Sequence, residues 1–540
     1  MNKFKLLVIL FLALIIINCS KNESKANKPN IIIILADDLG YGDIGVFGNK
    51  NIRTPNIDQM AFEGQKWTNF YAGASVCTPS RAALLTGRLP LRTGLTSNTR
   101  GVLFPNSLNG IPQSEITIAE QLKKSNYNTK LVGKWHLGNE EEYFPMNHGF
   151  DSWFGLPYSN DMDNVSNMNY WDMWKSDERK NYNNFNVPLI FDNKIIERPV
   201  NQRTLTKRYL NESLKFIEEN SNDNFFLYLA HSMPHVPLFS SEIFEGKSIA
   251  GPYGDVIEEI DYGVGEIINK IKKLGLSDKT IIVFTSENGP WLEMGEEGGT
   301  AGILRGGKGS TWEGGIRVPT VIWGPGYIKP GVVDDIGTSM DLFTTFSYLA
   351  DVEVPNDRII DGNNLISVFK SLSKSPTENF FYYWGAELMA VRYKSYKLHF
   401  KLHEAYDGKP METLQTPLLY NLDNDPSEKN NIYEDYLDVL GQIDEIIKKK
   451  FSKYKVNLLC AKNNVKLLAK QSREHNVKYV YLDNQKLNDK LKFLIPKDVK
   501  ILEKESLKNY LKSTKSDLSI LSVAGYESLK YRSEEHTSEL

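Results

Sequence analysis

The sequence predicts an α/β fold: a large, mostly parallel sheet sandwiched by helices, with a smaller C-terminal antiparallel-sheet subdomain. Residues 29–36 and 280–285 are continuous runs of β-branched and other apolar residues, which are typical of strands buried on both faces. Residues 255–274 carry apolar side chains at helical spacing. Strands that alternate with helices indicate an open parallel sheet, and beyond about residue 349 short aromatic strands replace this alternation.

The other elements follow in chain order. A helix ends across residues 215–220, and buried strands follow at residues 225–230 and 318–323. In an open parallel sheet, ligands bind at the carboxyl ends of the strands. The C-terminal subdomain is predicted from four aromatic strands, at residues 380–384, 389–393, 396–402 and 418–422. A turn at residues 423–428 and a closing helix at residues 433–450 complete it.

Composition limits the classes of function. The 540 residues are enough for a large core and more than one domain. The formal net charge of -3 argues against a nucleic-acid-binding protein, because there is no basic excess to neutralise phosphates. The three cysteines, Cys19, Cys77 and Cys460, require no disulfide framework.

The N-terminus has the pattern of an export signal. Lys3 and Lys5 precede an apolar run at residues 6–17 that is too short to span a bilayer comfortably. Residues 16–20 resemble a bacterial lipobox, which predicts lipidation of Cys19 and placement in the periplasm or at the cell surface; plain secretion is the alternative.

Cys77 begins the most informative stretch, Cys-Thr-Pro-Ser-Arg at residues 77–81. Pro79 is tolerated in a first helical turn, and helix-forming residues follow it. Cys77 is therefore expected at the mouth of a helix, where free N–H groups favour an anion, with Arg81 one turn along the same face. The alternative is a buried free cysteine before an ordinary amphipathic helix.

Carboxylates and an amide follow two of the predicted strands. Asp37 and Asp38 come directly after the first strand, and Glu287 and Asn288 end the strand at 280–285. Adjacent carboxylates repel each other unless a cation lies between them, and oxygen ligands without a His or Cys cluster suit Ca²⁺ or Mg²⁺ rather than zinc. A turn with a helix cap is the alternative for the Asp pair.

Further basic side chains lie in short motifs. Lys134 and His136 are expected to alternate on one face of a strand and so to reach one anion. His231 and His235 follow the strand at 225–230. Lys308 lies in a glycine-rich segment that lacks the Ser or Thr a phosphate-binding P-loop requires, and its glycines allow the backbone to approach a small anion.

These motifs together resemble the type I, formylglycine-dependent sulfatases of the alkaline-phosphatase-like superfamily. The resemblance rests on Cys-x-Pro-x-Arg at residues 77–81, on residues 132–138 and on the Gly-Lys…Glu-Gly-Gly segment at 307–315, and residues 149–159 are similar to the arylsulfatase A branch. It covers roughly residues 30–450. It departs from the family at Glu287, where an Asp is usual.

The resemblance implies the site and its chemistry. A formylglycine-generating enzyme would oxidise Cys77 to formylglycine, and Ca²⁺, with Mg²⁺ as the alternative, would be held by Asp37, Asp38, the modified Cys77, Glu287 and Asn288. The residues implied to be catalytic are Cys77, Arg81, Lys134, His136, His235 and Lys308. His136 would act as a base, whereas His235 and Lys308 would assist the leaving oxygen.

The implied substrate is a sulfated polysaccharide or oligosaccharide. Residues 151–186 are rich in Trp, Tyr, Asn and Asp, which suit sugar rings, although a glycan-independent surface insertion is an equal alternative. Two other functions are a phosphonate or phosphate ester hydrolase of the same superfamily and a non-catalytic glycan-binding surface lipoprotein.

The tail differs from the rest of the chain. Residues 456–471 resemble part of a deoxyxylulose-phosphate reductoisomerase without its dinucleotide loop, and residues 532–540 look like translated adapter DNA, which suggests a chimera; a genuine accessory domain is the alternative. The predicted organisation begins with a signal peptide (residues 1–19) and a polar tether (20–28). The catalytic domain (29–349) and the C-terminal subdomain (350–452) follow, and then the doubtful fragment (453–531) and the adapter-derived end (532–540).

Overall fold

The computed structural model describes residues 28–96, 101–404, 406, 408–451, 457–474 and 477–513. The chain divides into two compact units, Met1–Leu437 and Asp438–Leu540. The predicted signal peptide, the lipidated Cys19 and the adapter-like residues 532–540 lie outside the described residues. Among the residues described, no helix is long and apolar enough to cross a membrane.

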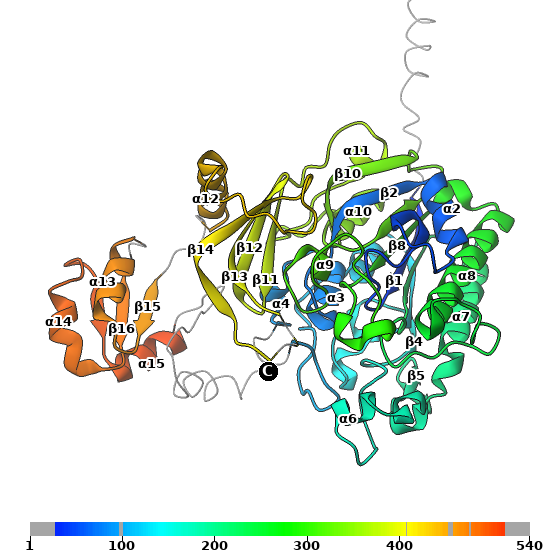
Figure 1. Cartoon of the computed structure of the whole chain (residues 1–540), viewed down its shortest axis with the longest axis horizontal. Helices are drawn as coiled ribbons and strands as arrows, with labels where there is room; N and C mark the ends of the chain where they lie inside the picture. The colour runs from blue at the N-terminus through cyan, green and yellow to red at the C-terminus, as the bar shows by residue number, and fades with distance from the viewer. Residues whose placement is uncertain are drawn as a thin grey trace, which may run out of the picture. The chain divides into compact units, whose positions relative to one another are not determined.

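A ten-stranded sheet forms the centre of the first unit (Figure 1). Its order is β10-β2-β9-β8-β1-β7-β3-β4-β5-β6. The strands β8, β1, β7, β3 and β4 are mutually parallel, whereas β9 runs antiparallel to both of its neighbours. The strands are β1 (Asn30–Ala36), β2 (Gln65–Tyr71), β3 (Asn128–Gly133), β4 (Ser152–Gly155), β5 (Leu189–Phe191), β6 (Lys194–Glu197), β7 (Phe225–Ala230), β8 (Thr280–Ser286), β9 (Thr320–Trp323) and β10 (Gly331–Thr338).

Helices cover both faces of this sheet, as the fully apolar β1 predicts. Alternate side chains of β1 enter two separate cores, Ile32 and Ile34 on one face and Ile31 and Ile33 on the other. The first face packs against α2 (Pro55–Glu63), α7 (Leu205–Glu219) and α8 (Gly251–Lys273), and the second against α3 (Cys77–Thr86), α5 (Ile118–Lys123) and α10 (Asp341–Leu349). The predicted fold class is confirmed.

A second sheet of four antiparallel strands follows in the same unit. Its strands are β11 (Asn379–Trp384), β12 (Glu387–Tyr393), β13 (Tyr396–Leu402) and β14 (Glu412–Asn421). The strand predicted at 418–422 begins at Glu412, six residues earlier, because its first half is an exposed edge rich in polar residues. The closing helix, α12 (Leu437–Phe451), begins four residues later than predicted.

Buried ions join the two sheets of this unit. Glu313 accepts hydrogen bonds from Tyr71 (2.6 Å) and Tyr382 (2.7 Å), and its carboxylate lies 3.0 Å from Lys397 Nζ. Glu428 lies 3.0 Å from the same ammonium group and accepts a hydrogen bond from the backbone N–H of Glu313. Although burial opposes ionisation, the cations hold the pKa of Glu313 well below its usual range. The second sheet is therefore fixed to the segment that follows Lys308.

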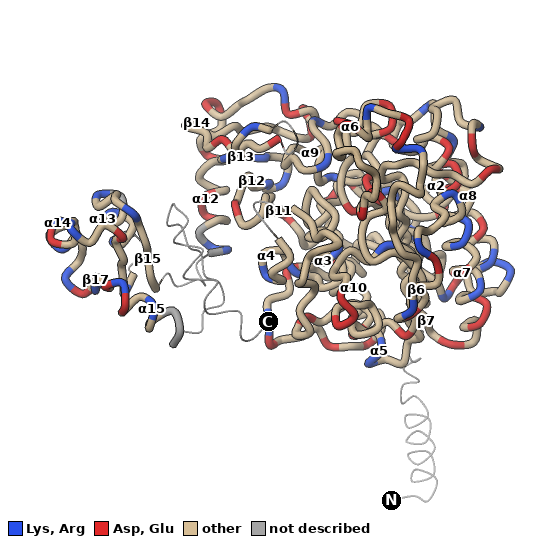
Figure 2. The backbone as a smooth tube through the Cα atoms, turned by 90° about the horizontal axis from the view of Figure 1, so that it is seen from below, with Lys and Arg blue, Asp and Glu red and all other residues tan. Residues whose placement is uncertain are grey.

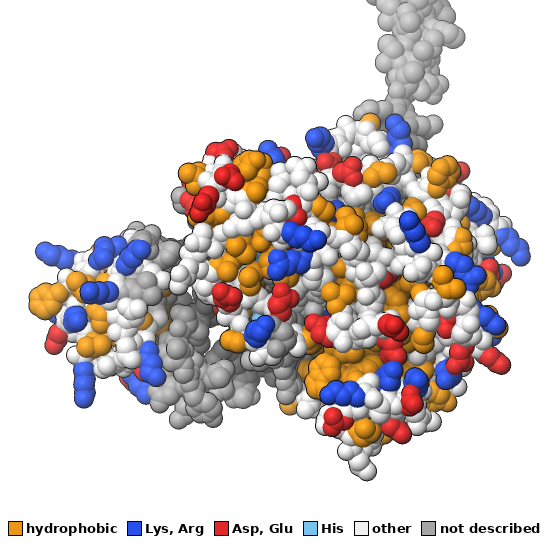
Figure 3. All heavy atoms as spheres, in the orientation of Figure 1, with side chains coloured by type: hydrophobic (Ala, Val, Ile, Leu, Met, Phe, Trp, Pro, Cys, Tyr) orange, Lys and Arg blue, Asp and Glu red, His pale blue; other side chains and the backbone are white. Residues whose placement is uncertain are grey.

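Surface charge agrees with the composition. Figure 2 shows Lys and Arg interspersed with Asp and Glu along the backbone. On the face drawn in Figure 3, basic side chains are scattered between acidic and apolar ones and form no continuous tract.

The second unit has a core of its own. Its parallel strands β15 (Leu458–Ala461), β16 (Tyr479–Leu482) and β17 (Lys500–Leu502) are joined through α13 (Val465–Glu474) and α14 (Asn488–Lys492). Leu468, Val480, Leu482 and Leu491 form its centre. The division of the chain falls at residues 437/438, near the start of α12, whereas the sequence places a boundary after residue 452.

We expect a chain that ends after residue 451 to unfold at the same temperature, and to hydrolyse sulfate esters at the same rate, as the full chain. All the predicted site residues and the cores of both larger sheets lie in the first unit. Calorimetry and steady-state kinetics on both chains provide the measurement. A loss of activity on truncation would show that the tail supports the enzyme and that the chimera hypothesis is wrong.

Candidate active site

The predicted site residues follow neighbouring central strands of the large sheet, at the carboxyl ends of these strands. Asp37 and Asp38 come after β1, and Glu287 and Asn288 come after β8, whose register pairs Ala36 with Ser286. His235 lies five residues beyond the end of β7, and Lys134 directly follows β3. Because these strands are parallel and adjacent, their carboxyl ends bring residues from four distant parts of the chain together.

Cys77 is the first residue of α3 and is only 2% exposed. Its Sγ lies 3.8 Å from Asp37 Oδ1. Burial, together with the negative charge of Glu287, raises the pKa of the Cys77 thiol well above its ordinary value. The helix N-terminus does not outweigh these effects, so the unmodified side chain is a thiol and a poor nucleophile.

Two cations and two carboxylates form a fully buried cluster beside Cys77. Lys134 Nζ lies 2.6 Å from Asp37 Oδ2 and Arg81 Nη2 lies 3.6 Å from the same oxygen, while Arg81 Nε contacts Glu287. Burial and repulsion from Asp37 raise the pKa of Glu287 to about 8, against the opposing effect of Arg81. Although burial opposes ionisation, Lys134 and His235 hold the pKa of the other carboxyl, Asp37, well below its usual range.

Asp38 is the centre of a second set of contacts. It accepts hydrogen bonds from Lys308 Nζ and Asn288 Nδ2, both at 2.7 Å, and lies 3.5 Å from His235 Nε2. Asn288 Oδ1 is buried and accepts no hydrogen bond from any described residue. That orphaned oxygen next to two carboxylates is what a hard cation would coordinate.

Potential ligand atoms converge on one point. One ligand atom from each of Asp37, Asp38, Cys77 and His235 lies within 4.8 Å of the others. Glu287 is not in this group, because its carboxylate is directed at Arg81. The two carboxylates, together with Asn288 Oδ1, fit a divalent cation that prefers oxygen, whereas the sulfur of Cys77 and the nitrogen of His235 also suit zinc; the place of Glu287 remains a prediction.

Lys134 and His136 do not alternate on a strand, which corrects the expectation from the sequence. β3 ends at Gly133, and His136 has a left-handed backbone with φ of 59°. Its Nε2 lies 2.8 Å from the carbonyl of Leu103, and its Nδ1 has no partner among the described residues. Burial, followed by the charge of Lys134, lowers the pKa of His136 well below its usual value, so the ring is neutral.

The two histidines beyond β7 have different surroundings. His235 Nε2 lies 3.3 Å from Ser159 Oγ, and burial and Lys308 lower its pKa. The backbone N–H of His231 donates to Leu35 in β1, and burial lowers its pKa to about 4. His231 is therefore a neutral side chain of the core.

Sequence reasoning did not select four residues that the structure places at or beside this site. Ser159 lies 3.1 Å from Lys134 Nζ. The Trp291 ring lies 4.4 Å from Lys308 Nζ, and the rings of Trp291 and Tyr406 are 5.1 Å apart. Asp161 acts electrostatically on His235. Trp291 directly follows the motif at residues 284–290, whereas Tyr406 comes from the distant β13–β14 connection, where no local pattern marks it.

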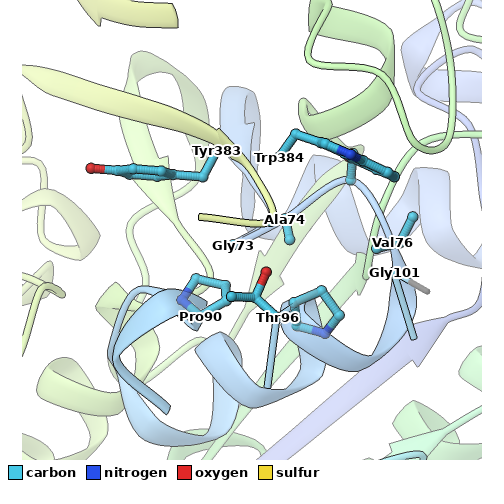
Figure 4. Close-up of a pocket in the computed structure, with 11 residues that line it drawn as sticks. Gly73, Ala74, Val76, Pro90, Thr96, Gly101, Tyr383 and Trp384 are labelled. Carbon is cyan, nitrogen blue, oxygen red and sulfur yellow. The ribbon is translucent and has the colours of Figure 1, made fainter. Parts of the chain in front are cut away.

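A narrow cavity lies behind the start of α3 (Figure 4). Gly73, Ala74 and Val76 line it, with Pro90 on one side and Trp384 of β11 on the other. Its volume is about 10 Å³, which is barely enough for one water molecule. A wider hollow of about 550 Å³ is lined by Tyr158, Asp163 and Arg198 among others.

Comparisons with known proteins agree with this geometry. The family model described as sulfatase matches residues 29–352, and that of the C-terminal region of aryl-sulfatase matches residues 375–476. A 1-deoxy-D-xylulose 5-phosphate reductoisomerase model matches residues 442–535, in agreement with the resemblance of the tail.

Individual relatives point the same way. Arylsulfatase A of Homo sapiens is 38% identical over 75% of this chain and 84% of the relative. The structure of PsFucS1 sulfatase from Pseudoalteromonas sp. has a TM-score of 0.71 and 31% identity, covering 80% of this chain and 91% of that one. Ps i-CgsB in complex with k-i-k-neocarrahexaose has a TM-score of 0.65 and 30% identity, covering 78% and 92%.

Proposed function

Because this chain belongs to the sulfatase family and is a sulfuric ester hydrolase, we propose that it desulfates a sulfated polysaccharide or oligosaccharide, using formylglycine made from Cys77 and a bound Ca²⁺. The observation that carries the proposal is the position of Cys77 at the start of α3, within 3.8 Å of a carboxylate that Lys134 and Arg81 also contact. A small tetrahedral anion bound there would meet both cations and a helix N-terminus.

The metal site supports this proposal. Asp37, Asp38, Asn288 and the modified Cys77 would hold the ion, with Glu287 as a further ligand. Bound there, Ca²⁺ would supply positive charge that stabilises the sulfuryl group in the transition state. Arg81 and Lys134 would add to that charge from the opposite side of Asp37.

Hydrated formylglycine at position 77 would supply one hydroxyl for attack on sulfur and a second for the release of sulfate. The chain's own residues move the protons. His136 Nε2 donates to the carbonyl of Leu103, because a carbonyl can only accept, and this tautomer leaves Nδ1 as the basic atom. His136 would therefore accept a proton at Nδ1.

Lys308 and His235 would face the leaving oxygen. Although burial opposes its charge, Asp38 holds the pKa of Lys308 well above its usual value, so Lys308 carries a proton at neutral pH. The pKa of His235 is lowered. Lys308 would stabilise the leaving oxygen mainly through its charge and a hydrogen bond, because a raised pKa makes it a weak acid, and His235 would assist from the same side.

Several parts of the proposal rest on the sequence. The N-terminal 19 residues support export and a lipid anchor at Cys19. A formylglycine-generating enzyme is the maturation partner that Cys-x-Pro-x-Arg requires. An exported, anchored sulfatase would act on glycans outside the cell.

Paired kinetics test the reaction class. We expect the matured enzyme to hydrolyse an aryl sulfate at least about tenfold faster than the matching aryl phosphate, a difference of about 1.4 kcal/mol in the transition state. The dianionic phosphate meets more repulsion from Asp37 and Asp38 than the sulfate monoanion does. The reverse preference would favour the phosphate or phosphonate hydrolase, and binding of a sulfated glycan without turnover would favour the lipoprotein alternative.

A further inference from the structure

Three aromatic rings and one acid adjoin the groups that face the leaving oxygen. These are Tyr170 of α6 (Tyr170–Trp174), Trp291, Tyr406 and Asp161, which we call the distal cluster. The rings of Tyr170 and Trp291 are stacked, with centroids 6.5 Å apart and an interplanar angle of 19°. Tyr406 approaches the same Trp291 ring at 5.1 Å.

Trp291 connects this cluster to the reaction centre. Its ring centroid lies 5.6 Å from that of His235 and 4.4 Å from Lys308 Nζ. The alcohol part of a bound ester would leave the sulfur on the side of these two residues, next to Trp291. The C–H groups of a pyranose ring pack well against aromatic side chains, and Trp291, which is 7% exposed, and the half-buried Tyr406 offer their accessible edges to a sugar.

Asp161 has the chemistry of a recognition group rather than of an ion pair. Its side chain is 9% exposed, and its Oδ2 accepts a hydrogen bond of 2.9 Å from the Tyr170 hydroxyl. Its Oδ1 is buried and accepts no hydrogen bond within the described parts of the chain. A buried carboxylate oxygen without a donor is costly, and a ligand O–H would satisfy it.

The Nε1 of Trp291 is a complementary polar atom. It is buried, and no described residue accepts its hydrogen bond. It can therefore donate to a ring oxygen or a hydroxyl oxygen, while Asp161 can only accept. Together they match a group that both donates and accepts, as a sugar hydroxyl does.

Charge on this side of the site is negative. The charge of Asp161 acts on His235, where it opposes the burial that lowers the pKa of that ring. The cation in contact with the cluster, Lys308, is paired with Asp38 at 2.7 Å. A second sulfate or a carboxylate on the leaving ring would thus meet Asp161 without a free cation to compensate for it.

We propose that the distal cluster binds the leaving ring of the substrate, and that it selects a neutral pyranose with a free hydroxyl over a ring that carries a second anionic group. The ring packs against the accessible edges of Trp291 and Tyr406, and one of its hydroxyls donates to Asp161 Oδ1. This inference rests on the proposed sulfatase function. The test below distinguishes a failure of the proposed function from a failure of the inference.

The test compares kcat/KM of the matured full-length enzyme for two defined oligosaccharides, one whose terminal ring carries a single sulfate and one whose ring carries two. An aryl sulfate normalises both values. We expect the parent to prefer the monosulfated ring, and Asp161→Asn to reduce that preference about tenfold, because the neutral amide no longer repels a second anionic group on the ring. Asp177→Asn is the matched control, since this acid of the same segment is exposed and, among the described residues, forms its ion pair with Lys180.

Two results would overturn the inference: a parent that prefers the disulfated ring, or an Asp161→Asn enzyme with the preference of the parent. The first result is measured on the parent enzyme alone. The inference can therefore be overturned even if Asp161→Asn does not fold. If no sulfate ester is hydrolysed, the proposed function fails, and the subsite is then tested by calorimetric binding of the desulfated oligosaccharide. Weaker binding by Asp161→Asn supports the subsite, and equal binding overturns it.

Discussion

Replacing Cys77 by Ala is expected to reduce the turnover of every sulfate ester by at least about 10⁴-fold, the scale of losing a covalent nucleophile. Peptide mass spectrometry of the active parent should show residue 77 as an aldehyde or its hydrate. Within the described residues the thiol takes part in a single, long hydrogen bond, of 3.8 Å to Asp37, so the variant should fold and unfold like the parent. Cys77→Ser should keep activity only if the maturation machinery accepts serine.

The raised pKa of Cys77 supports the prediction that residue 77 is modified in the active enzyme. Burial and the charge of Glu287 raise the pKa of the Cys77 thiol, which disfavours the thiolate as a nucleophile and supports the proposed oxidation. Fully active enzyme in which residue 77 carries only an intact thiol would contradict the mechanism. Such a result would leave the fold and the family unchanged and would remove formylglycine from the account.

The second large effect is expected at Glu287. Glu287→Ala should lose most of the activity and weaken Ca²⁺ binding by about 10- to 100-fold, because it removes a carboxylate from the site and one of the two acidic partners of Arg81. Glu287→Asp restores the residue usual in the family and should keep both metal and substantial activity. Calorimetric Ca²⁺ titration and kinetics after chelation measure the two effects, and Ca²⁺ should restore the chelated enzyme better than Zn²⁺.

A nearby exposed acid provides the control. Glu296→Ala removes a carboxylate from the same segment, but that side chain lies on the surface, and both measurements should match the parent. If Glu287→Ala binds Ca²⁺ and turns over like the parent, then Glu287 is not a ligand. The contact with Arg81 would then be its whole role.

The central strands could be predicted because burial on both faces leaves an apolar run that is visible in the sequence. The parallel arrangement of β1 and β8 then places Asp37, Asp38, Glu287 and Asn288 together. The direction of β9 could not be predicted, since an apolar run indicates burial and not orientation. β2 was missed because its sequence, Gln65–Tyr71, mixes polar residues with aromatic ones.

The directions of the side chains within the site could not be predicted from the sequence either. The left-handed backbone of His136 follows the end of β3, where strand periodicity no longer applies. Glu287 turns to Arg81 because that guanidinium lies on α3, more than 200 residues earlier in the chain. Tyr406 reaches Trp291 from the second sheet, which only the completed fold brings near.

The burial of Cys77 also fixes when it can be modified. A side chain with 2% exposure at the start of α3 is out of reach of another enzyme once the site has closed. The segments that close it, up to Lys308, lie as many as 231 residues (308 minus 77) later in the chain. At 5–20 residues per second, synthesis leaves about 10–50 s between the emergence of Cys77 and that of Lys308. The oxidation of Cys77 must therefore be complete before the site folds. Conditions that speed folding or slow the oxidising partner would yield a well-folded but permanently inactive protein.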